Sequence, residues 1–159
     1  MLFKAVTTFF EILAIDHLIA RDPDLEIQLE LLFSRINNAY AAIMRQADAL
    51  VIASPVYWFT VSAQTKLFID RCYALGGGDP SRYALTGKQV GIVLTYGDSD
   101  PFNSGAVNAL RTFQDTYNYI GAEIVGMIYG SADHAGDVRQ NDSLMAEAKE
   151  LGVKIGSSG

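Results

Sequence analysis

The chain alternates short, nearly continuous apolar runs with longer segments in which apolar residues recur at three- and four-residue steps. Continuous runs are typical of strands whose two faces are both covered, as in a parallel sheet between helix layers. They predict strands at Thr8–Ile15, Ala49–Ser54, Val90–Tyr96 and Glu123–Tyr129. The spaced apolar positions are typical of amphipathic helices. They predict helices at about Leu25–Ala47, Ser62–Leu75, Ser104–Ile120 and Asp142–Ile155.

Three residues mark the ends of these helices. The Ser62 hydroxyl can accept a hydrogen bond from an early helix amide, which predicts that Ser62 is an N-cap. Asp142 is expected to cap the last helix in the same way. Gly121 follows the third helix, where a glycine in a left-handed conformation commonly ends a helix.

Strands that alternate with helices of this length imply crossover connections, which build a mostly parallel sheet. The predicted fold class is therefore α/β: a three-layer, doubly wound parallel sheet. With 159 residues, the chain is expected to form one domain over residues 1–159.

Composition and charge exclude several function classes. The formal net charge of −6 argues against a nucleic-acid or anionic-lipid partner, and the apolar N-terminal run is too short to span a bilayer. The only cysteine, Cys72, cannot form an internal disulfide, which fits a cytoplasmic protein, and its place on an apolar stripe predicts a core residue. His17 and His134 lack the spacing of metal ligands, so no metal site is predicted.

Two loops stand where a ligand would bind. In an open parallel sheet, ligands occupy the crevice beyond the carboxyl ends of the strands. The loops Ser54–Ser62 and Thr95–Gly105 leave the second and third predicted strands, and both are rich in aromatic residues. These rings could pack on a flat ligand, or they could plug the sheet edge or a subunit contact.

The motif "ADALVIASPVYWFTVSAQTKLFIDR" resembles that of the flavodoxin-like NAD(P)H-dependent FMN reductases, and the resemblance continues over about residues 36–151. It implies an FMN-binding protein, usually a dimer or a larger oligomer. NAD(P)H would reduce the flavin, which would pass the hydride to a quinone, nitro compound or other small-molecule acceptor. Because the flavin carries the chemistry, no catalytic side chain is expected.

The resemblance also implies the residues around the flavin. The expected cofactor-binding residues are Ser54, Pro55, Val56, Tyr57, Trp58, Thr95, Tyr96, Gly97 and Asp98. The first five would border the ribityl chain and ring, and the others would lie along the opposite side. Gly97 would let the backbone approach the ring closely.

The chain departs from this family at its N-terminus. The segment "VTTFFEILAIDHL" aligns better with the family's second strand than with its first, and no phosphate-binding loop is found. Each lost charge-assisted hydrogen bond would cost FMN binding about 1.5–3 kcal/mol. A truncated or non-catalytic scaffold of the same fold, which binds flavin weakly or not at all, is therefore the alternative. A one-electron carrier would need the same loop, and an iron–sulfur cluster is excluded because its cysteines are missing.

Overall fold

The computed structural model describes residues 31, 35, 38–76 and 83–157. The predicted strand Thr8–Ile15 and most of the predicted helix Leu25–Ala47 lie outside the described residues. Residues 38–46, at the end of that predicted helix, are helical.

The described strands form one sheet in the order β2-β1-β3-β4. Three of them, β1 (Ala49–Tyr57), β3 (Gln89–Tyr96) and β4 (Glu123–Ser131), are parallel, as predicted. The fourth, β2 (Thr60–Val61), was not predicted and pairs antiparallel with the end of β1.

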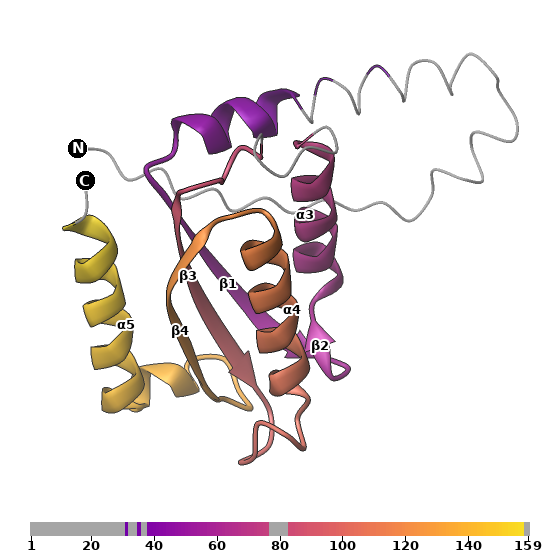
Figure 1. Cartoon of the computed structure of the whole chain (residues 1–159). Coiled ribbons are helices and arrows are strands. Elements are labelled where there is room, and N and C mark those ends of the chain that lie inside the picture. The colour runs from indigo at the N-terminus through magenta and orange to yellow at the C-terminus, as the bar shows by residue number, and fades with distance from the viewer. Residues whose placement is uncertain (1–30, 32–34, 36–37, 77–82, 158–159) are drawn as a thin grey trace, which may run out of the picture.

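Helices cover both faces of this sheet. Figure 1 shows α3 (Ala63–Ala74) and α4 (Ala106–Tyr119) on one face and α5 (Asp142–Gly156) on the other. A short 3₁₀-helix, η2 (Asp137–Gln140), precedes α5. This arrangement confirms the predicted three-layer α/β fold.

The apolar residues of the sheet are buried in two clusters. The larger cluster lies on the α3 and α4 side, where the fully buried rings of Phe113 and Tyr117 stack with centroids 6.2 Å apart. In the smaller cluster, α5 packs very close to the strands. A Cβ added at Gly126 would lie 2.7 Å from Leu151 Cδ1, so the absence of a side chain there permits the approach.

Two boundaries differ from the sequence prediction. The strand predicted to end at Ser54 continues to Tyr57, and Pro55 pairs with Thr95 inside the ladder. A proline cannot donate a ladder hydrogen bond, but it is tolerated in edge strands, and among the described strands residues 49–55 of β1 pair only with β3. The cap of α5 is Asn141, whose side chain accepts from Leu144 N at 3.0 Å; Asp142 is in the first turn.

One face of β1 is left open by the described elements. On the α5 side of the sheet, Val51 is 49% exposed, because α5 lies over β3 and β4. In the part of the chain that the structure describes, no helix has the length and apolar character needed to cross a bilayer.

Candidate functional site

The two loops chosen from the sequence lie side by side. The parallel register sets Pro55 of β1 beside Thr95 of β3, so both strands deliver their following segments to the same end of the sheet. In Figure 1 this is the lower end of the molecule, where the β1 and β3 arrows point.

The first loop is a tight hairpin, which we call the aromatic hairpin (residues 56–61). Val56 pairs with Val61 and Tyr57 with Thr60, so Trp58 and Phe59 form a two-residue turn. Both turn residues have positive φ, 47° and 68°, as a type I′ turn requires. The turn directs aromatic side chains outward: Trp58 is 90% exposed and Tyr57 63% exposed.

Buried hydroxyl groups fasten the base of the aromatic hairpin. Thr65 Oγ1 donates to Ser54 Oγ at 2.9 Å, and Ser54 Oγ donates to the Pro55 carbonyl at 2.9 Å. The Ser62 and Thr65 hydroxyls are also 2.9 Å apart, and Ser62 caps α3 as predicted by accepting from Thr65 N. The Ser54 hydroxyl is therefore engaged inside the protein, whereas Tyr57 and Trp58 face solvent.

The second loop, after β3, is held in shape by hydrogen bonds between its own backbone amides and the Asp98 side chain. Asp98 has a φ of 77°, and its carboxylate accepts hydrogen bonds from the amides of Ser99 and Asp100. Tyr96 is only 7% exposed, so its ring is a buried wall of this end of the sheet. Burial raises the pKa of the Tyr96 phenol, and nearby Tyr129 and Asp100 raise it further, so the phenol is neutral at physiological pH.

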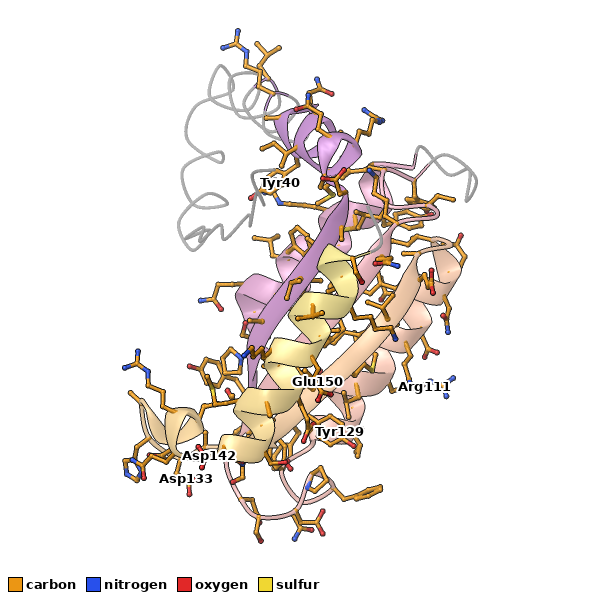
Figure 2. The ribbon with its side chains drawn as sticks, turned by 90° about the vertical axis from the view of Figure 1, so that its left-hand side faces the viewer. Tyr40, Arg111, Tyr129, Asp133, Asp142 and Glu150 are labelled. Carbon is orange, nitrogen blue, oxygen red and sulfur yellow. The ribbon has the colours of Figure 1, made fainter. Side chains whose placement is uncertain are left out.

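A third loop, after β4, was missed in the sequence analysis. Ala132 N donates to the Tyr96 carbonyl at 2.8 Å, and Ser131 Oγ donates to the Asp98 carbonyl. A Cβ on Gly97 would lie 3.1 Å from Asp133 Oδ1, so the loop after β4 packs against Gly97. Gly97 is the residue whose backbone was expected to approach the flavin ring closely. Figure 2 shows Tyr129 and Asp133 toward the same, lower end of the sheet. The carboxyl-end rule applies to β4 as well, and could have found this loop.

The chemistry of the three loops suits a planar, uncharged ring system better than an anion. Exposed aromatic faces and backbone polar groups meet at this end of the sheet, while Asp98, Asp100 and Asp133 supply negative charge. Among the described residues, none of the predicted site residues is cationic. The described residues hold no group of three or more His, Cys, Asp or Glu arranged for a metal ion.

Comparison with known proteins identifies the fold family. The family model described as the flavodoxin-like fold matches residues 20–155, most of the chain. The chain belongs to the flavodoxin-like fold family.

Several relatives of this flavodoxin-like protein are named as flavoproteins or as FMN-dependent oxidoreductases. It is 25% identical over 126 residues to YwqN of Bacillus subtilis (strain 168), whose name describes an NAD(P)H-dependent FMN-containing oxidoreductase; the match covers 75% of this chain and 68% of YwqN. It is 34% identical to an iron–sulfur flavoprotein of Archaeoglobus fulgidus, over 71% of this chain and 47% of that protein. It is 33% identical to FMN-dependent NADH:quinone oxidoreductase 3 of Pseudomonas fluorescens (strain Pf0-1), over 65% of this chain and 54% of that protein. The chain thus spans about half the length of the last two relatives.

Solved structures share the fold of this flavodoxin-like protein. The Trp repressor binding protein from Bacillus subtilis has a TM-score of 0.62 and 23% identity, with coverage of 72% of this chain and 69% of that chain. General stress protein 14 from Treponema denticola, solved in complex with FMN, has a TM-score of 0.55 and 23% identity, with coverage of 76% and 71%. At these identities the likeness establishes the architecture alone.

Proposed function

We propose that this protein is an FMN-dependent NAD(P)H oxidoreductase that passes a hydride, by way of its flavin, to a quinone, nitro compound or other small acceptor. The observation that carries the proposal is the aromatic hairpin, which presents Tyr57 and Trp58 to solvent at the end of the sheet where the neighbouring strand β3 also ends. The family match and the names of the relatives support the same general reaction.

The residues present fit the ring of FMN. Tyr57 and Trp58 would offer aromatic faces, and the backbone of residues 95–98 would offer polar groups to the edge of the ring. FMN, when bound, supplies the capacity to accept and donate a hydride. The protein's own part is to bind and orient the ring and to limit the access of water to it.

The phosphate of FMN has no evident anchor among the described residues. Asp98 and Asp100 would repel a dianionic group, and a phosphate that stays in solvent adds little affinity. We therefore expect that FMN and riboflavin, which share a ring but differ in the phosphate, bind with similar affinity.

An oligomer is part of the proposal. Trp58, Tyr57 and the 74% exposed Phe102 are exposed aromatic residues of the two loops at one end of the sheet, and clusters of exposed apolar residues mark contacts with another subunit. We infer a homodimer or tetramer, acting in the cytoplasm, in which a neighbouring subunit helps to enclose the flavin.

The alternative function is an oligomeric scaffold of the same fold that binds flavin weakly or not at all. The observation that favours it is that none of the described residues proposed to bind the flavin is cationic, so none of them would pair with the FMN phosphate. The exposed aromatic residues would then serve subunit contacts only.

Flavin binding to the purified protein separates the two functions. The protein is titrated with FMN and, in parallel, with riboflavin, while flavin absorbance and fluorescence are recorded, and NADH or NADPH oxidation is then measured with a quinone acceptor. Saturable binding at micromolar flavin with oxidation above that of free flavin supports the oxidoreductase. If the protein is colourless, binds neither flavin and oxidises NADH or NADPH no faster than free flavin does, the scaffold function is supported instead.

A further inference from the structure

We propose that helix α4 fixes the tip of the aromatic hairpin through Gly105 and Asn108, and that these two residues are positioning residues for Trp58. The inference deepens the proposed function and rests on it, because Trp58 is expected to contact the flavin. Neither Gly105 nor Asn108 was singled out from the sequence.

The turn is held in a conformation that its residues disfavour. Two-residue turns of this type prefer Asn-Gly or Asp-Gly, because both central residues need positive φ. Here the positions are filled by Trp58 and Phe59, bulky residues for which positive φ is a genuine outlier. Such strain persists only where the surrounding structure enforces it, and it concentrates at functional sites.

Gly105 provides the space that the turn needs. It precedes α4 with a φ of 77° and is buried against the hairpin. A Cβ at this position would lie 2.4 Å from Phe59 Cα and 2.7 Å from the Phe59 carbonyl oxygen, distances that no real Cβ contact shows. The backbone of the turn therefore rests directly on the start of α4.

Asn108 supplies a directional bond one helical turn further along. Its Nδ2 donates to the Phe59 carbonyl oxygen at 3.1 Å, across 49 residues of sequence. On the other side, Val61 is buried in the larger core cluster, and the hydroxyls of Ser54 and Thr65 secure the base. The backbone of the turn is thus held from its base and from α4.

The Trp58 side chain gains little burial from the contacts that hold the backbone of the turn. It is 90% exposed, and its ring meets the Phe59 ring edge-on at 5.7 Å. Burial of Trp58 therefore does not explain the strained backbone. A fixed, outward-facing indole is what a platform for a planar ligand requires, since a preorganised ring loses less entropy on binding.

Trp58 is the only tryptophan of the chain, so intrinsic fluorescence reports directly on the hairpin tip. The test compares wild type with Asn108→Ala, which removes the side chain, and Asn108→Asp, which keeps the shape but replaces the donor with a carboxylate. Asn118→Ala, an exposed asparagine toward the other end of α4, is the matched control. For each protein, Trp58 anisotropy is measured without flavin, the FMN dissociation constant by titration, and the unfolding midpoint by urea.

We expect lower Trp58 anisotropy in both Asn108 variants and an FMN dissociation constant raised about two- to tenfold, the range for one hydrogen bond. Asn118→Ala should match wild type in Trp58 anisotropy and in FMN affinity. Asn108→Gln, which keeps an amide donor, should recover part of the lost anisotropy and affinity. Gly105→Ala should disturb Trp58 more strongly; if it fails to fold, the Asn108 series decides.

Unchanged Trp58 anisotropy and FMN affinity in both Asn108 variants, even with a lower unfolding midpoint, would overturn the proposal and leave a packing role. If no variant and not even wild type binds flavin, the proposed function fails. In that case a fall in anisotropy confined to the Asn108 variants would still support the positioning of Trp58 by α4.

Discussion

Thr65 Oγ1 donates a 2.9 Å hydrogen bond to Ser54 Oγ and so joins the first turn of α3 to the carboxyl end of β1. Both side chains are buried, and the Ser62 hydroxyl lies 2.9 Å from the same Thr65 oxygen. The aromatic hairpin lies between Ser54 and Ser62 in the sequence, so this contact closes the base of the hairpin. Loss of this hydrogen bond should therefore lower the free energy of unfolding of the whole protein.

Thr65→Val keeps the shape of the side chain and removes its hydroxyl. It removes the 2.9 Å donor to the buried Ser54 oxygen and leaves only the longer contact from Ser62 N at 3.5 Å. A poorly satisfied buried group costs about 1–3 kcal/mol. We expect the free energy of unfolding, measured with urea, to fall by that amount. Thr112→Val is the control, because the Thr112 hydroxyl bonds within its own helix, to the Asn108 carbonyl, at an exposed position. Equal effects of the two substitutions would contradict the structural role of Thr65.

Cys72 should be unreactive in the native protein. It is buried in the larger core cluster, as predicted, and burial raises the pKa of its thiol from 9.0 to about 12. We expect thiol reagents at pH 8 to label Cys72 only after the chain is unfolded, because the reactive thiolate is absent from the native state. Rapid labelling of the native protein would mean that this side chain is accessible.

The same burial predicts a pH dependence of stability. Between about pH 9 and 12 the unfolded thiol loses its proton while the native one keeps it, so the native state binds more protons. The contribution of Cys72 is therefore complete below pH 9 and declines as the pH rises toward 12. Urea unfolding of wild type and Cys72→Ala across this range isolates the effect. Identical slopes in the two proteins would contradict it.

Two glycines should respond in opposite ways to alanine. Gly152 lies within α5, and an added Cβ would meet nothing within 4 Å, so Gly152→Ala should raise the free energy of unfolding by about 0.5–1 kcal/mol. Gly121 follows α4 with a φ of 71°, so Gly121→Ala should lower it by about 1–2 kcal/mol. Thermal unfolding of the two variants shows whether each substitution raises or lowers the stability. A stabilising Gly121→Ala would be inconsistent with the left-handed end of α4.

Trp58→Ala should weaken FMN binding with little effect on folding. An aromatic face that stacks on a planar ring contributes about 1–3 kcal/mol, by analogy with base stacking. The side chain is 90% exposed, so its removal costs the fold little. Flavin titration gives the affinity, and Tyr119→Ala, which removes another exposed aromatic ring at the far end of α4, is the control. Equal flavin affinity in the two variants would show that Trp58 is not part of the binding surface.

The sequence alone determined the architecture. Continuous apolar runs placed β3 and β4 to within two residues of their ends, and the spaced apolar positions did the same for α4 and α5. Local chemistry also located Ser62 at the start of α3 and Gly121 at the end of α4. These features depend on periodicity and on backbone preferences that act over a few residues, so one sequence suffices to find them.

Only the tertiary structure decided how the candidate site is built. It extended β1 through Pro55, turned the expected loop into the aromatic hairpin, buried Tyr96 and added the loop after β4. Gly105 and Asn108 meet Phe59 across more than forty residues. No local pattern encodes such contacts, because they arise only when parallel strands and crossover helices bring distant segments to one end of the sheet.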